Sequence, residues 1–107
     1  MKVYIAGPIS LGGLLTNPEQ VEHNIWQFNN LAKHLRYDGI EVLNPVELPP
    51  QPDWAAYMVL TIPMVCEADT VMVLDGWELS RGARLEVFLA HELGKRVIAA
   101  GREDVNG

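Results

Sequence analysis

The sequence predicts an α/β fold in which a parallel sheet of four to five strands lies between two layers of helices. The first observation is that short apolar runs alternate with segments of helical periodicity, in the order β-α-β-α-β-α-β. Such alternation is typical of parallel sheets with right-handed crossovers. The second observation is the run Thr70 to Leu74, which is apolar or β-branched at every position. A run of this kind indicates a strand that is buried on both faces.

Length and composition limit the interpretation further. The chain has 107 residues, of which 49% are hydrophobic, so residues 1–107 are expected to form a single packed domain. The net charge of −6 argues against a nucleic-acid polymer as partner, because such binders need a basic surface. No apolar segment has the length that crosses a bilayer. Since Cys66 is the only cysteine, no internal disulfide can form, and we expect a cytoplasmic protein with no membrane partner.

The first strand is expected at Lys2 to Ala6, and a glycine-rich loop follows at Gly7 to Gly13. Backbone amides in a loop after a strand can face an anion. The loop lacks the residues of a P-loop and of a dinucleotide fingerprint. The alternative interpretation is a crossover loop with no ligand.

A helix, a strand and a proline-rich loop come next. Asn17 caps the helix, Pro18 takes its first position and Gly39 ends it. Residues 40–43 form the second strand. The prolines between residues 45 and 52 exclude regular structure there and predict a stiff surface loop.

A second helix is expected from Trp54, with Asp53 as its cap, to about Ile62, because Pro63 should kink or end it. This helix is apolar nearly all round, which indicates burial on more than one side. In a chain of this size it suggests a subunit interface, and we expect a homodimer or a higher homo-oligomer. Cys66, in the same apolar run, is interpreted as an inert core residue.

The most informative segment begins with the buried strand at residues 70–74. Ser80 is a good cap for the helix that follows it. Three apolar positions of this helix lie on nearly the same face as Glu86: Ala83, Ala90 and Leu93. The Glu86 carboxylate is therefore expected to turn toward the sheet, at the edge where open parallel sheets bind ligands. The alternative is a glutamate at the rim of the core with its head group in water.

A different face of that helix carries basic side chains and is expected to face solvent: Arg81, Arg84, His91 and Lys95. The last strand follows at residues 95–99. The three histidines are isolated from one another, and no residues have the spacing of a metal site. The sequence therefore predicts neither a metal nor another cofactor.

Several motifs occur in the order that is found in one known family. V-Y-I-A-G-P-I-S spans Val3 to Ser10, L-N-P spans Leu43 to Pro45, and W-A-A-Y spans Trp54 to Tyr57. A-D follows at Ala68-Asp69, and the most specific motif, D-G-W-E-L-S-R-G-A-R-L-E, spans Asp75 to Glu86. Through these motifs almost the whole chain resembles the nucleoside 2-deoxyribosyltransferase-like proteins. It is most similar to their small bacterial and phage subgroup, which is related to the 2′-deoxynucleoside 5′-phosphate N-hydrolases.

The resemblance implies a flavodoxin-like three-layer sandwich and an enzyme that cleaves the N-glycosidic bond of a 2′-deoxynucleoside or its 5′-monophosphate. Glu86 matches the family's nucleophile, which attacks the anomeric carbon and forms a covalent glycosyl-glutamate intermediate. Water or a second base resolves the intermediate, so the family includes hydrolases and base-exchange transferases. Tyr4 matches a tyrosine that hydrogen-bonds this glutamate. Its alternative interpretation is a strand aromatic in the core.

The resemblance also implies a site for a small nucleoside or nucleotide. Gly7, Ile9 and Ser10 match a loop that holds a 5′-phosphate in the nucleotide-hydrolysing relatives. The other predicted substrate-binding residues lie in the most specific motif: Asp75, Trp77, Ser80 and Gly82. The last two of these match a small turn that lets the substrate approach.

One position departs from the family. Relatives usually carry an aspartate eight residues before the aspartate of A-D, where this chain has Thr61. That carboxylate acts near the base, so protonation of the leaving group lacks its usual donor. Asp75 lies at the correct edge of the sheet to take its place, whereas Asp69 should lie at the far end of its strand.

Three functions therefore stay open. Tyr4 with Glu86 favours an N-glycosidase, and Thr61 favours a non-catalytic nucleotide-binding module. The exposed proline loop and the apolar second helix favour a structural partner with a vestigial site.

Overall fold

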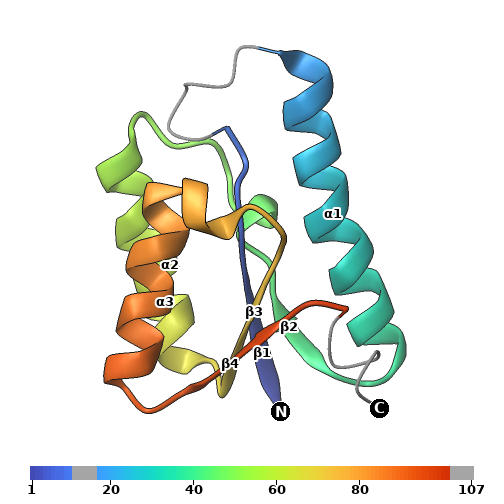
Figure 1. The fold of residues 1–107 in the computed structure, drawn as a ribbon, viewed down its shortest axis with the longest axis vertical. Helices are drawn as coiled ribbons and strands as arrows, with labels where there is room; N and C mark the ends of the chain where they lie inside the picture. Colours follow the sequence, from blue (N-terminus) through green and yellow to red (C-terminus); the bar gives the residue numbers. More distant parts are fainter. Residues whose placement is uncertain (11–16, 102–107) are drawn as a thin grey trace.

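The computed structural model describes residues 1–10 and 17–101, and it confirms the predicted α/β architecture. Within these residues, four parallel strands alternate with three helices (Figure 1). The strands are β1 (Lys2–Ala6), β2 (Glu41–Leu43), β3 (Thr70–Val73) and β4 (Arg96–Ala99). The helices are α1 (Pro18–Tyr37), α2 (Trp54–Glu67) and α3 (Arg81–Glu92), and two short 3-10 turns are η1 (Pro45–Glu47) and η2 (Trp77–Leu79).

The sheet has the strand order β2-β1-β3-β4, and each neighbouring pair is parallel. β1 lies inside the sheet, where Tyr4 is in register with Leu43 on one side and Val71 on the other. This order is that of the flavodoxin-like sheets, in which the connections reverse direction between β1 and β3. Ligands bind to such sheets at the carboxyl ends of these two strands.

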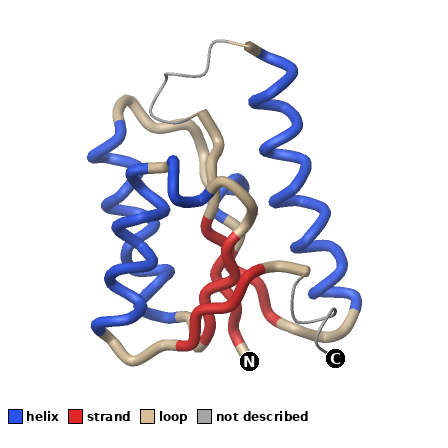
Figure 2. The backbone as a smooth tube through the Cα atoms, in the orientation of Figure 1, coloured by secondary structure: helices blue, strands red, loops and turns tan. Residues whose placement is uncertain are grey.

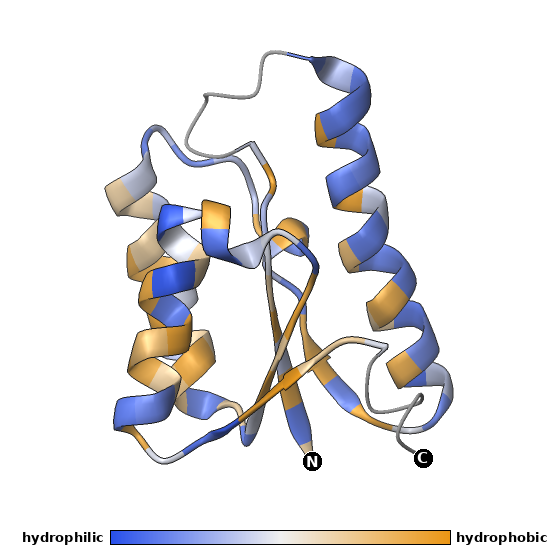
Figure 3. Ribbon diagram, in the orientation of Figure 1, coloured by the Kyte–Doolittle hydropathy of each residue, from blue (hydrophilic) through white to orange (hydrophobic). Residues whose placement is uncertain are grey.

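Helices cover both faces of the sheet. Figures 1 and 2 show α1 on one side and the pair α2 and α3 on the other. Side chains of β1 alternate between the two layers, as they must in a pleated strand. Tyr4 and Ala6 pack with α2 and α3, whereas Ile5 packs with Phe28 and Ala32 of α1. Hydropathy colouring shows apolar positions of α1 on the side that faces the sheet (Figure 3), so the predicted three layers are present.

Each helix begins directly after the capping residue that was predicted for it. The side chain of each cap accepts a hydrogen bond from a backbone N–H of the first turn: Asn17 for α1, Asp53 for α2 and Ser80 for α3. These bonds satisfy donors that have no partner inside a helix. Among the described residues, no helix is long and apolar enough to cross a membrane.

α2 is longer than the sequence predicted. It continues through Pro63 to Glu67, whereas an end near Ile62 was expected. A proline inside a helix removes one hydrogen bond, to the carbonyl four residues earlier, and that residue here is Val59. The Val59 position is 68% exposed, so water reaches this turn and can satisfy the carbonyl that Pro63 leaves unbonded.

Three smaller predictions were wrong. The proline-rich segment contains the turn η1, because the Asn44 side chain accepts a hydrogen bond from the Val46 N–H at 3.3 Å. Cys66 is exposed and not in the core, since its neighbour Val65 points inward and a helix turns by about 100° per residue. Leu93 lies after the last turn of α3 and is half exposed, so it does not extend the buried face of the helix.

Candidate functional site

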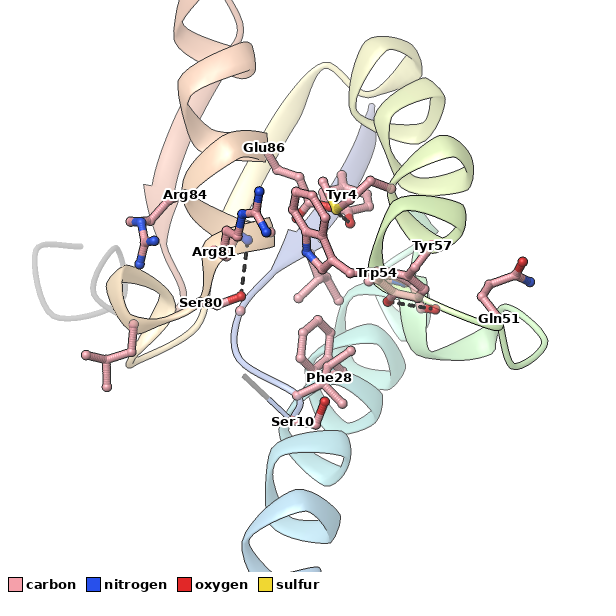
Figure 4. A pocket seen from close by; sticks show the side chains of 18 of the residues that line it. Tyr4, Ser10, Phe28, Gln51, Trp54, Tyr57, Ser80, Arg81, Arg84 and Glu86 are labelled. Atoms are coloured by element: carbon pink, nitrogen blue, oxygen red, sulfur yellow. Dashed lines mark hydrogen bonds between the residues drawn. The ribbon is translucent and has the colours of Figure 1, made fainter. Parts of the chain in front are cut away.

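A pocket of about 680 Å³ lies at the carboxyl edge of the sheet. Its walls come from the loop after β1, the first half of α2 and the first half of α3 (Figure 4). Phe28 of α1 and Pro45 of η1 complete its lining. The location is the one that the strand order predicts, and the volume is typical of sites for small organic ligands.

A hydrogen-bonded pair, Glu86 and Tyr4, lies within this pocket. Tyr4 Oη donates to Glu86 Oε2 at 2.7 Å. The two side chains are buried, with exposures of 4% for Glu86 and 1% for Tyr4. α3 lies close to the sheet here because the residues that flank Glu86 on its inner face, Ala83 and Ala90, are small. The alternative interpretation of Glu86, with its head group in water, is therefore excluded.

Burial controls the protonation of the pair. Loss of hydration raises the pKa of Glu86 from 4.5 to about 7, and hydrogen bonds from Tyr4 and Thr61 oppose that rise. Burial, together with the negative charge of Glu86, raises the pKa of Tyr4 well above its ordinary value. The phenol therefore keeps its proton at neutral pH, while the carboxyl is divided between its two forms. A carboxyl group with such a pKa inside a pocket is typical of catalytic sites.

Aromatic side chains of α2 form one wall of the pocket. Tyr57 Oη donates to the Pro45 carbonyl oxygen at 3.4 Å. Burial, followed by the charge of Glu86, raises the pKa of Tyr57, so this phenol is also neutral. The Arg81 guanidinium lies 3.9 Å from the centre of the Trp54 ring, a cation–π contact that joins the first turns of α2 and α3. This wall offers flat apolar surfaces on which a planar ligand can stack.

The loop after β1 contributes three lining residues: Gly7, Ile9 and Ser10. A Cβ at Gly7 would lie 2.9 Å from Leu74 Cβ, so only glycine allows this close approach to the end of β3. The Ile9 carbonyl accepts a hydrogen bond from Asn24 Nδ2 at 2.8 Å, which holds the loop against α1. The remainder of the predicted glycine loop, at residues 11–16, lies outside the described residues.

The first turn of α3 forms another side of the pocket. Ser80 Oγ accepts the backbone N–H three residues later at 3.2 Å and so caps the helix. Gly82 allows α2 to come close, because a Cβ there would lie 3.3 Å from Met58 Sδ. Arg81 and Arg84 are exposed and line the pocket. The helix terminus and these two guanidinium groups give a positive region to a protein whose net charge is −6.

Acidic groups at the pocket are few. Among the described residues, those that line it are Asp53 and Glu86. Asp53 Oδ1 accepts the Ala56 N–H at 2.8 Å as the cap of α2. In the same described part of the chain, no group of three or more His, Cys, Asp or Glu side chains could hold a metal ion. Of these two acidic side chains, Glu86 is the buried one.

The chain matches one known protein family over most of its length. The family described as "Domain of unknown function (DUF4406)" matches residues 1–99. The chain belongs to this family. The match extends from before β1 to the end of β4 and so includes every strand and helix of the described structure. No curated protein matches the chain significantly.

The pocket of this DUF4406 protein brings together most of the residues that the sequence predicted: Tyr4, Gly7, Ile9, Ser10, Ser80, Gly82 and Glu86. Asp75 and Trp77 are not among its lining residues. Asp75 lies in a smaller hollow beside α1, whereas Trp77 packs against the core under α2 and α3. The chain turns between them at Gly76, whose φ of 84° lies in the left-handed region. Asp75 is therefore not positioned to replace the carboxylate that the nucleoside 2-deoxyribosyltransferase-like proteins, which the sequence resembles, carry at the position of Thr61.

The sequence analysis did not predict most of the α2 residues that line the pocket. The lining residues that it did not predict include the cap and the first turns of this helix: Asp53, Trp54, Tyr57 and Met58. The W-A-A-Y motif contained a usable signal, because its two aromatic residues are three apart and share one face of a helix. Arg81 and Arg84 are exposed, as predicted, but they also line the pocket.

The raised pKa of Glu86 predicts that stability depends on pH. Below about pH 4.5 the glutamate is protonated in both the folded and the unfolded chain, so it has no effect. Between pH 4.5 and about 7 the folded state holds a proton that the unfolded state has lost, so the free energy of unfolding falls as pH rises. Above pH 7 the loss is complete and is on the order of 3 kcal/mol. Glu86→Gln carries no such charge, so its stability relative to wild type should rise between pH 5 and pH 8.

Urea unfolding of both proteins at pH 5 and pH 8 measures this difference. Glu92→Gln, at an exposed position of the same helix, is the matched control. A stability difference between wild type and Glu86→Gln that is the same at both pH values would contradict the prediction.

Proposed function

We propose that this protein cleaves the N-glycosidic bond of a 2′-deoxynucleoside or a 2′-deoxynucleoside 5′-monophosphate. The observation that carries the proposal is the buried Glu86 carboxyl, held by Tyr4 at 2.7 Å within a pocket of about 680 Å³. The resemblance of the motifs around both residues to the nucleoside 2-deoxyribosyltransferase-like proteins supports the same reaction. The pocket volume suits a mononucleotide and not a polymer.

The reaction has two steps. In the first, an ionised oxygen of Glu86 bonds to the anomeric carbon, and the bond from that carbon to the base nitrogen breaks. The electron pair leaves with the base, which takes up a proton. In the second, water or another base attacks the same carbon and releases the glutamate. An attacking water loses one proton, which balances the proton that the departing base took up in the first step. A carboxylate suits both steps, because it stabilises an oxocarbenium-like transition state and then forms a covalent bond.

Neighbouring side chains have distinct tasks in this scheme. Tyr4 donates to one oxygen of Glu86 and so directs the other. The Trp54 and Tyr57 rings provide the surface for a planar base. In this scheme Ser10 and the positive region of Arg81 and Arg84, all of which line the pocket, would hold a 5′-phosphate.

The second candidate function is a nucleotide-binding module of the same fold that does not turn its ligand over. Thr61 favours it, because a neutral side chain stands where relatives carry a carboxylate that acts near the base. A panel of deoxynucleosides and their 5′-monophosphates, incubated with and without a free base, separates the two functions. Release or exchange of base supports the enzyme, whereas tight binding without release supports the module.

The first prediction from this function concerns Glu86→Ala. It should reduce base release to less than about a hundredth of the wild-type rate, because loss of a covalent nucleophile raises the barrier by several kcal/mol. The fold should persist, since alanine is a good helix former. Glu92→Ala, on the exposed side of α3, should retain wild-type activity. A glycosyl adduct on Glu86 in a mass spectrum would support the covalent step, and substantial activity in Glu86→Ala would exclude it.

The second prediction concerns the phosphate. If the positive region holds a 5′-phosphate, monophosphates should bind more tightly than the corresponding nucleosides, and added salt should reduce the preference. Arg84→Ala should weaken monophosphate binding by about fivefold, as expected for an exposed ion pair. Lys33→Ala, on the exposed surface of α1, is the control. Calorimetric titration measures each affinity, and equal affinities for both ligand classes would indicate a nucleoside enzyme without a phosphate site.

We further propose that the protein forms a homodimer through the outer face of α2 and its neighbour α3. Large apolar side chains are exposed there, with Val59 at 68% and Phe88 at 60%. α2 carries no charged residue before Glu67. A second copy fits this surface, because a twofold axis brings identical faces together and the α2 part of the surface, which is uncharged, does not repel itself.

The dimer is tested by sedimentation at micromolar concentration. We expect wild type to sediment above the 11.9 kDa of one chain. Val59→Asp should dissociate it, since burial of an unpaired charge costs several kcal/mol. Glu22→Asp, on α1, should leave assembly unchanged. A wild-type monomer would refute the dimer, and an assembled Val59→Asp variant would exclude α2 from the interface.

A further inference from the structure

The pocket contains a second phenol, Tyr57, whose hydroxyl group is weakly bonded. Tyr57 on α2 and Glu86 on α3 both line the pocket, on different walls (Figure 4). Tyr57 Oη donates to the Pro45 carbonyl oxygen at 3.4 Å, whereas O–H···O hydrogen bonds in proteins are usually about 2.7–2.8 Å long. Tyr4 Oη, by contrast, is 2.7 Å from Glu86 Oε2. Tyr57 is therefore the phenol that is free to turn toward a ligand.

The proposed reaction needs a proton donor in the pocket, because the departing base takes up a proton. Glu86 is not that donor, since it must be ionised to bond to the anomeric carbon. Tyr4 is bonded to Glu86 through its hydroxyl group. Asp53 Oδ1 accepts the first-turn N–H of Ala56 as the cap of α2, a role that suits an ionised carboxylate.

The other lining residues that carry a hydrogen on nitrogen or oxygen are weaker acids than a phenol. Arginine does not lose its proton in proteins, and aliphatic hydroxyl, indole and amide groups also hold their hydrogens more tightly than a phenol does. Among the described residues, this set consists of Ser10, Gln51, Trp54, Ser80, Arg81 and Arg84. Tyr57 is therefore the best proton donor on the described walls of the pocket.

The charge of Glu86 couples the acidity of Tyr57 to the reaction. In the free protein, burial and then the negative charge of Glu86 raise the pKa of Tyr57, so the phenol keeps its proton. When Glu86 bonds to the anomeric carbon, its carboxylate becomes a neutral ester and the second of these causes disappears. The phenol thus becomes a stronger acid at the step in which the base leaves with its electron pair.

We propose that Tyr57 is a catalytic residue that gives its hydroxyl proton to the departing base. The base keeps the electron pair of the broken glycosidic bond and gains the proton, and Tyr57 is left as a phenolate. In the second step the attacking water, or the acceptor base, gives one proton to this phenolate, so the phenol is restored and the charges balance. Trp54 lies three positions earlier on the same face of α2, so a base stacked on its ring would present an edge to the hydroxyl group. This role rests on the proposed function.

The test compares substrates whose bases need a proton on leaving with analogues whose bases do not. 2′-Deoxyguanosine is paired with 7-methyl-2′-deoxyguanosine, whose base leaves as a neutral molecule. 2′-Deoxyuridine is paired with 5-nitro-2′-deoxyuridine, whose base leaves as a stable anion. Each is assayed as the nucleoside and as the 5′-monophosphate. Tyr57→Phe should lower kcat/KM by about a hundredfold for the ordinary member of a pair, the scale of general acid catalysis, but by less than about threefold for its analogue.

Tyr37→Phe is the matched control, because Tyr37 ends α1 and is 91% exposed. It should leave the rates for both members of a pair unchanged. Tyr57→Phe keeps the ring and loses one weak hydrogen bond, so it should fold as wild type does, which urea unfolding checks. Equal losses for both members of a pair, as a purely structural role would cause, or an unchanged rate in Tyr57→Phe would overturn the proposal. A wild-type protein that releases base from none of these substrates would overturn the proposed function as well, and that result is seen without any substitution.

Discussion

The contact on which the site depends is the hydrogen bond between Tyr4 and Glu86. Glu86 is only 4% exposed, and a buried carboxylate is costly unless donors replace its hydration; here the phenol is the donor at 2.7 Å. The bond also connects α3 to the interior strand β1. It therefore opposes the rise in the Glu86 pKa that burial causes, and it ties the helix that carries Glu86 to the sheet.

Small residues allow this arrangement to form. Ala83 and Ala90 let α3 approach the sheet, and Gly82 lets α2 approach α3. Gly7 permits the loop after β1 to pass beside Leu74. Three of these positions, Gly7, Gly82 and Ala83, line the pocket and leave side-chain volume free at the carboxyl edge of the sheet. The space is lined instead by aromatic residues of α2, so the pocket is largely apolar, with polar groups that include Glu86 and the start of α3.

Charge is distributed unevenly between the pocket and the rest of the protein. The chain as a whole is acidic, yet Arg81 and Arg84 line the pocket beside a helix N-terminus. Local positive charge of this kind favours a small anion at short range, and the overall negative charge disfavours polyanions, which agrees with the mononucleotide ligand that we propose.

The sequence alone determined the alternation of strands and helices, the helix caps, and the face of α3 on which Glu86 lies. These features depend on contacts within a few residues, so periodicity and capping residues predict them. Only the tertiary structure decided how deeply Glu86 is buried, that Asp75 lies outside the pocket, and that α2 continues through Pro63. Burial depth and pKa depend on residues that are distant in the chain, such as Tyr4 and Glu86, which are 82 positions apart. Local patterns do not encode such contacts, because they arise when β1, α2 and α3 pack together.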